Sequence, residues 1–147
     1  MTVPVRLAHV AVPAQDPRQL AAFYHDLLGL TVTVQGTLPP MGDFVFLSER
    51  PQEQVQTLTF MTQARARHIA WEVDSLAALK SVYAEARARG IVIDQALDHR
   101  VTWSLYLHDP EGNGIEVFWA TGQRTDRSVA EPLDLALLEQ PEPAATN

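Results

Sequence analysis

The chain repeats its own pattern of residues after a shift of 59 positions, and this repeat limits the possible folds more than any other feature. The segment that begins at His9 falls on the segment that begins at His68, and Phe44–Leu47 falls on Trp103–Tyr106. Identity between the halves is low, but the order and spacing of the expected elements agree. Self-similarity at a fixed period indicates a duplicated structural unit.

Each half is predicted to contain one strand, one helix and three further strands. Asp16 and Pro17 are typical of a helix N-terminus, and Gly29 is typical of its end. In the second half, Asp74 is expected to cap a helix that ends at Gly90. The apolar face of the first helix is expected at Leu20, Phe23, Tyr24, Leu27 and Leu28. The expected strands are 5–12, 30–35, 43–48, 54–61, 68–73, 91–96, 101–108 and 114–120.

These elements predict an α+β fold made of two tandem βαβββ modules. Mixed sheets are expected to form an open, barrel-like cleft with the helices packed outside. Module one covers about 5–62 and module two about 66–121, within a single domain of residues 1–122. The tail, 123–147, is expected to hold a short helix near 128–138 and a disordered end after Gln140.

Composition excludes several classes of function. Acidic residues outnumber basic residues 18 to 11, the net charge is −7, and no run of Lys or Arg exists, so no nucleic-acid partner is expected. No apolar run approaches the roughly 18 residues of a membrane span, and the first residues do not resemble a signal peptide. The chain has no cysteine, which excludes disulfides and thiolate metal sites. We therefore expect a cytoplasmic protein without a membrane partner.

Three residues at matched strand positions suggest a metal site. His9 and His68 occupy equivalent positions in the two halves, and Glu116 lies within an apolar stretch of the last expected strand. Two imidazoles and one carboxylate form the facial triad typical of non-haem Fe(II) sites, which leaves coordination positions free for other ligands. A single strand histidine is usually structural, but two in register across a duplication favour a metal site. A carboxylate inside an apolar strand is also costly to bury unless a positive charge lies beside it.

Tyr106 and His99 are the expected catalytic residues. Tyr106 and Glu116 are equally distant from Glu111 in the turn between them, so a regular hairpin places them opposite each other on one face. A phenol there could orient a substrate, although an ordinary half-buried tyrosine is the alternative. His99 is suited to proton transfer near neutral pH, or is a solvated loop residue. Core packing is the default for strand aromatics, and Trp103 and Phe118 are the better candidates to line a substrate pocket.

Three stretches of the sequence resemble the vicinal oxygen chelate superfamily. They are the opening Leu7–Val12, the helix Phe23–Leu30 and the hairpin Ser104–Glu116, and the resemblance covers roughly 5–121. The superfamily contains glyoxalase I, fosfomycin-resistance thiol transferases, bleomycin-binding proteins and extradiol ring-cleavage dioxygenases. Within it, the chain is most similar to a small catechol 2,3-dioxygenase-type protein.

The resemblance implies a function and a set of residue roles. His9, His68 and Glu116 take the metal-ligand positions, with Fe(II) expected and Mn(II) or another divalent metal as alternatives. The substrates would be a small catechol-like aromatic diol and O₂, and the ring would open beside the diol. Tyr106 would hold the substrate oxygen and His99 would assist proton transfer. The superfamily also suggests a homodimer.

Other members of the superfamily provide the alternative functions. Glyoxalase I-type isomerases place a fourth ligand at the position equivalent to Glu116 in the first half, where this chain has Thr57. Thiol transferases that open epoxides share the His, His and Glu set, but they need cations for a phosphonate, and the final strands here offer little positive charge. Drug-binding proteins of the same fold use an apolar cleft without a metal, which an intact ligand set disfavours.

Overall fold

The structure, a computed structural model, describes residues 3–125 and 129–140. The chain divides into two compact units. The N-terminal unit is Leu7–Ala70, and the C-terminal unit comprises Met1–Arg6 and Trp71–Asn147. Across the described residues, no helix has the length and apolar character needed to cross a bilayer.

The order of the elements confirms two βαβββ modules in an α+β fold. The first module consists of β1 (Val5–Pro13), α1 (Pro17–Leu28), β2 (Thr31–Leu38), β3 (Gly42–Ser48) and β4 (Leu58–Met61). The second consists of β5 (His68–Val73), α2 (Leu76–Ala88), β6 (Ile93–Asp98), β7 (Thr102–His108) and β8 (Gly114–Ala120). Parallel and antiparallel pairs both occur, so the sheets are mixed as predicted. The described strands of neither unit close into a barrel.

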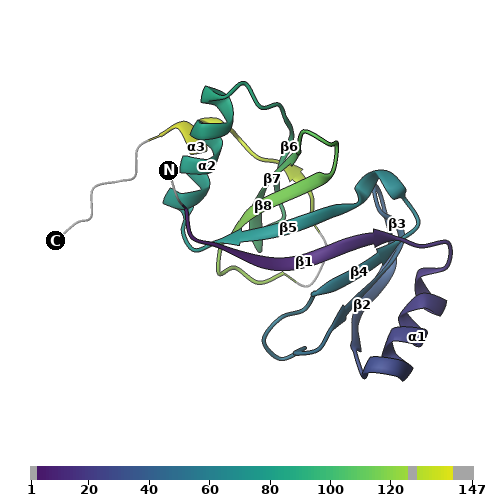
Figure 1. Ribbon diagram of the computed structural model, residues 1–147. Helices are drawn as coiled ribbons and strands as arrows, with labels where there is room; N and C mark the ends of the chain where they lie inside the picture. Colours follow the sequence, from purple (N-terminus) through teal and green to yellow (C-terminus); the bar gives the residue numbers. More distant parts are fainter. Residues whose placement is uncertain (1–2, 126–128, 141–147) are drawn as a thin grey trace. The chain divides into compact units, whose positions relative to one another are not determined.

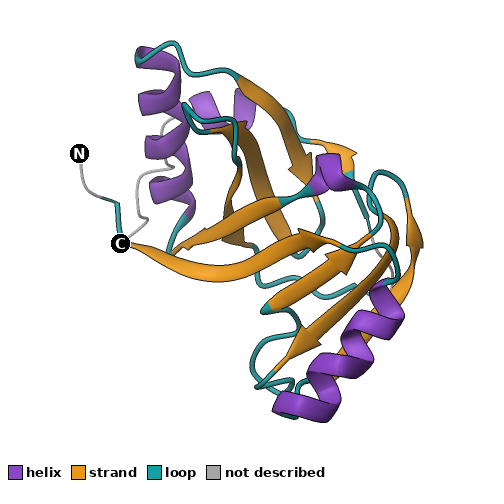
Figure 2. Ribbon diagram, turned by 45° about the vertical axis from the view of Figure 1, so that its right-hand side comes forward, coloured by secondary structure: helices purple, strands orange, loops and turns teal. Residues whose placement is uncertain are grey.

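In the N-terminal unit the strand order is β2-β3-β4-β1, and α1 covers one face of these strands (Figure 2). β1 runs parallel to β4, while β2, β3 and β4 pair antiparallel. The predicted helix ends are confirmed. The Asp16 carboxylate accepts hydrogen bonds from the backbone N–H groups of Arg18 and Gln19, and Gly29 adopts a left-handed conformation with φ 73°.

Two expectations for this unit were wrong in part. The apolar face of α1 is only half covered: Ala21 packs into the core with Val45, Leu47 and Phe60, but Phe23, Leu27 and Leu28 stay 57%, 65% and 62% exposed. The fourth strand starts at Leu58 rather than at residue 54. The preceding residues make side-chain contacts instead, because the Gln54 amide donates to the carbonyls of Ala8 and Gln56.

In the C-terminal unit the strand order is β5-β8-β7-β6-β9, where β9 is Glu131–Pro132. The helix α2 is capped by Ser75 rather than by the predicted Asp74, because the Ser75 hydroxyl accepts from the Ala78 N–H at 3.1 Å. A buried cluster joins α2 to the sheet and to the tail, and its large members are Val73, Leu79, Tyr83, Leu105, Val117, Leu133 and Leu138.

The described part of the tail contributes a short strand and a helical turn to this unit. Instead of one helix near 128–138, the described residues form the short strand β9 and the single helical turn α3 (Ala136–Glu139), which lies beside α2 (Figure 1). Buried Leu133 and Leu138 explain the difference, because each inserts into the core of the unit. Residue 128 and the end of the tail after Gln140 lie outside the described residues.

Candidate metal and catalytic site

The two predicted histidine ligands lie together in the N-terminal unit. His9 is buried within β1, and His68 is half-buried at the start of β5. Their Nε2 atoms are 3.0 Å apart, and the rings meet edge to face at 77°. The duplication therefore brings its two equivalent histidines to one point, with the same ring nitrogen of each directed at the other.

A backbone contact fixes the tautomer of His68. Its Nδ1 lies 2.7 Å from the carbonyl of Ala66, in the 3₁₀ turn Ala64–Ala66. Since a carbonyl only accepts, Nδ1 carries the proton, and the Nε2 atom of the neutral ring presents its lone pair to His9. Histidine ligands are commonly oriented in this way, with one nitrogen donating to a backbone carbonyl and the other binding the metal. The donor set of this pair fits a divalent cation.

Glu116 and Tyr106 form the corresponding pair in the C-terminal unit. They lie directly opposite each other on β8 and β7, which confirms the predicted hairpin register. The Tyr106 hydroxyl donates to Oε1 of Glu116 at 2.9 Å, and Glu116 is only 5% exposed. A buried carboxylate needs donors or a positive charge, and the phenol supplies one donor.

His99 extends this pair into a chain of hydrogen bonds. Its Nε2 lies 3.0 Å from the Tyr106 hydroxyl, and its Nδ1 lies 2.6 Å from the carbonyl of Val129. The half-buried ring is therefore held at both nitrogens, unlike a solvated loop residue. Sequence reasoning missed Val129 because a backbone carbonyl leaves no signal in residue type.

Burial, reinforced by the negative charge of Glu116, raises the pKa of Tyr106 above its ordinary value near 10. The phenol therefore keeps its proton, and its ability to donate, across the neutral range. Because the folded pKa lies above the unfolded one, the associated stability is present below about pH 10 and is lost as the pH rises further.

This shift predicts a delayed ionisation in an alkaline titration. We expect the Tyr106 phenolate absorbance to appear only as the protein unfolds, whereas an exposed phenol ionises near pH 10. The measurement compares phenolate absorbance and circular dichroism in the wild type and in Tyr106→Phe, whose difference isolates this phenol. A Tyr106 phenolate that forms near pH 10 in folded protein would contradict the expectation.

The two expected pocket residues lie on opposite faces of the β7–β8 hairpin. Phe118 is two residues from Glu116 on the same strand, so it shares the face of Glu116 and Tyr106. Trp103 falls on the other face, where it packs edge to face against Trp119 over the core beneath α2. The alternation of side chains along a strand produces this difference. Of the two, only Phe118 lies on the face that carries Glu116 and Tyr106.

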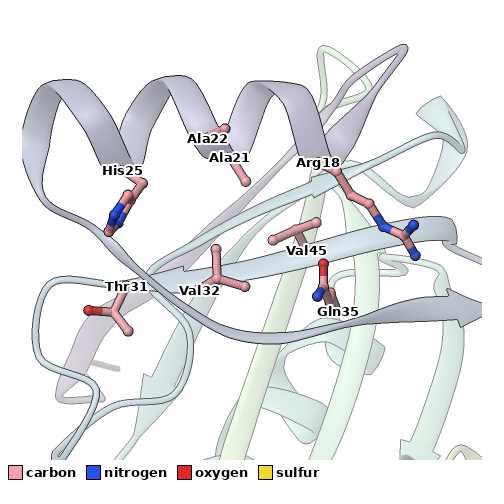
Figure 3. A pocket seen from close by; sticks show the side chains of 8 residues that line it. All are labelled: Arg18, Ala21, Ala22, His25, Thr31, Val32, Gln35 and Val45. Atoms are coloured by element: carbon pink, nitrogen blue, oxygen red, sulfur yellow. The ribbon is translucent and has the colours of Figure 1, made fainter.

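A separate hollow of about 460 Å³ lies in the N-terminal unit between α1 and the strands β2 and β3 (Figure 3). Val32 and Val45 line its strand side together with Thr31 and Gln35, and Arg18 and His25 stand at opposite ends of its helical wall. Nδ1 of His25 is bonded to the Leu30 carbonyl at 2.8 Å. None of the predicted site residues lines this hollow.

Sequence comparison identifies a matching family and a related protein. The model of the Glyoxalase/Bleomycin resistance protein/Dioxygenase superfamily matches residues 6–117. Biphenyl-2,3-diol 1,2-dioxygenase 3 of Rhodococcus globerulus is 31% identical over 123 residues, with 80% of this chain and 64% of the relative covered. The chain thus spans less than two thirds of that dioxygenase.

Solved structures share the fold at lower identity. A 2,3-dioxygenase from a Pseudomonas species has a TM-score of 0.63 and 17% identity, covering 87% of this chain and 46% of that one. An Mn(II)-bound glyoxalase from Novosphingobium aromaticivorans has a TM-score of 0.61 and 18% identity, covering 85% and 44%. With the family match over most of its length, this chain belongs to the glyoxalase, bleomycin resistance protein and dioxygenase superfamily, the vicinal oxygen chelate group that its sequence resembles.

Proposed function

We propose that this chain is a metal-dependent extradiol-type dioxygenase that opens the ring of a small catechol-like aromatic diol. The observation that carries the proposal is the facing pair of Nε2 atoms of His9 and His68, with Nδ1 of His68 bonded to the Ala66 carbonyl as is common for histidine ligands. The identity to a biphenyl-diol dioxygenase supports the aromatic diol as the class of substrate.

In this proposal His9, His68 and Glu116 hold one divalent metal, and each contributes one ligand atom. We propose Fe(II), with Mn(II) as the alternative, because two imidazoles and one carboxylate suit either ion. When bound, the iron supplies the Lewis-acid and redox chemistry through which O₂ is added across a ring bond beside the diol. A chain without cysteine fits a reducing compartment, and we place this chemistry in the cytoplasm.

The residues around Glu116 have distinct roles in the proposal. Tyr106 keeps its proton and donates it in a hydrogen bond to a substrate oxygen. His99 Nε2, in contact with the same hydroxyl, accepts the Tyr106 hydroxyl proton as Tyr106 takes a proton from the substrate diol, so the phenol is left protonated. Phe118, on the same face, lies against the aromatic ring.

Metal analysis of protein purified without oxygen, followed by oxygen uptake with a panel of catechols, tests the proposal. Bound iron with a coloured ring-cleavage product supports it. Manganese with activity only towards a thiol and an epoxide would replace it with a transferase, and metal-free protein that binds an aromatic drug would replace it with a binding protein. A glyoxalase is disfavoured because the Thr57 hydroxyl is already bonded to Glu49 Oε2 at 2.7 Å.

We also propose that the chain forms a homodimer through the exposed apolar residues of α1, which are Phe23, Leu27 and Leu28. A second copy would remove this surface from water, and a two-fold pair is the commonest way to do so. We expect Leu27→Ser to convert the dimer to a monomer in sedimentation velocity. The matched control is Val92→Ser, which alters an exposed valine of the C-terminal unit and should leave the dimer intact. A monomeric wild type would contradict the proposal.

A further inference from the structure

Residues 129–140, which follow the family match, are built into the C-terminal unit. We call residues 129–140 the C-terminal segment. Its β9 pairs with the end of β6 through Leu97 and Pro132, and the Leu133 N–H donates to the Ala96 carbonyl at 2.9 Å. Leu133 and Leu138 are 7% and 3% exposed within the core of the unit. The segment is therefore packed against the same unit that carries His99, Tyr106 and Glu116.

Polar contacts add to these apolar anchors. Arg87 and the Tyr83 hydroxyl on α2 both contact the Glu139 carboxylate, and Lys80 Nζ donates to the Gln140 carbonyl at 3.0 Å. Exposed ion pairs such as these contribute little, so the buried leucines provide most of the stability of the contact. Loss of both leucine side chains should therefore loosen the segment.

One atom of the C-terminal segment contacts His99, the first member of the hydrogen-bonded series His99, Tyr106 and Glu116. The Val129 carbonyl lies 2.6 Å from Nδ1 of His99, and because the carbonyl only accepts, Nδ1 must carry the proton. The opposite nitrogen, Nε2, then faces the Tyr106 hydroxyl at 3.0 Å as an acceptor, so the single phenol proton is shared between His99 Nε2 and Glu116 Oε1. His99 also begins a tight turn, in which its backbone N–H donates to the Thr102 carbonyl at 2.9 Å and Arg100 has φ 68°.

We propose that the C-terminal segment is a positioning element for His99, and that the Val129 carbonyl sets the tautomer and orientation of its ring. Through His99 the segment also steadies the Tyr106 hydroxyl, which lies 2.9 Å from Glu116. The effect on turnover rests on the proposed dioxygenase function, whereas the contact between Val129 and His99 does not. A segment that follows the family match thereby becomes part of the catalytic arrangement.

The first test is nuclear magnetic resonance of the imidazole nitrogens in the full chain, with His99 assigned by the loss of its signals in His99→Gln. We expect a protonated Nδ1 whose proton exchanges slowly with water. In the variant Leu133→Ala/Leu138→Ala we expect a mixture of tautomers and fast exchange. Leu137→Ala, an exposed leucine of the same helical turn, is the matched control and should retain the wild-type signals. A wild-type His99 protonated at Nε2 alone would overturn the proposal, whether or not the variants fold.

The second test is a double-mutant cycle on oxygen uptake with a catechol. Loosening the segment should lower kcat about 10-fold with a smaller change in KM, as for groups that orient a catalytic histidine. In the His99→Gln background the same leucine changes should cause no further loss, because the segment acts through His99. Equal losses in both backgrounds would overturn the positioning role. A wild type without turnover would instead refute the dioxygenase function, and the nitrogen spectra would still decide the contact.

Discussion

Glu116→Gln is expected to remove bound metal and ring cleavage while leaving the fold intact. The amide keeps an oxygen that accepts the Tyr106 hydrogen bond, so the local packing is preserved. It removes the negative charge that the proposed site needs to bind a divalent cation beside two neutral imidazoles. Because a metal supplies several kcal/mol of stabilisation to its reaction, we expect turnover to fall by about 10³-fold or more.

The measurements are metal content per chain, oxygen uptake with a catechol and circular dichroism. Glu111→Gln is the matched control, because it makes the same chemical change at an exposed position in the turn of the same hairpin. It should retain metal and activity. Full metal content and unchanged turnover in Glu116→Gln would remove this carboxylate from the ligand set.

Most of the fold was predictable because local signals and the duplication agreed. Asp16 and Gly29 mark the ends of α1, and the five-residue turn around Glu111 fixes the register that places Tyr106 opposite Glu116. The same repeat indicated that His9 and His68 are equivalent, and the structure places their Nε2 atoms 3.0 Å apart. Such features depend on the spacing of residues along the chain, which can be read directly from the sequence.

The features that escaped prediction depend on contacts between distant residues or on surfaces without a partner. The Val129 carbonyl lies 30 positions from His99, and no side chain signals the contact. Trp103 was a candidate pocket residue because it is an aromatic side chain on a strand, but strand alternation directs it to the core beneath α2. The periodicity of α1 indicated an apolar face, yet it could not show that Phe23 and Leu27 stay exposed within one chain.

Tyr106→Phe is expected to impair both catalysis and stability. Removing the hydroxyl deletes the donor to Glu116 and the contact with His99 Nε2, which leaves one buried and one half-buried polar group without that partner. Loss of a buried hydrogen-bond partner costs about 1–3 kcal/mol, so the melting temperature should fall by several degrees. Loss of a positioned proton donor should lower kcat by about 10²-fold, while metal content is retained because none of the proposed ligands changes.

Comparison with the control Tyr24→Phe separates these effects from the removal of any phenol. Tyr24 lies on α1 with its ring against Phe60 and has no part in the hydrogen bonds of His99, Tyr106 and Glu116, so its variant should keep wild-type turnover. Combining Tyr106→Phe with His99→Gln should give a loss smaller than the product of the two single losses, because both residues act through one chain of hydrogen bonds. If the double variant instead shows the full product, Tyr106 and His99 work independently, and the geometry that joins them at 3.0 Å has no part in catalysis.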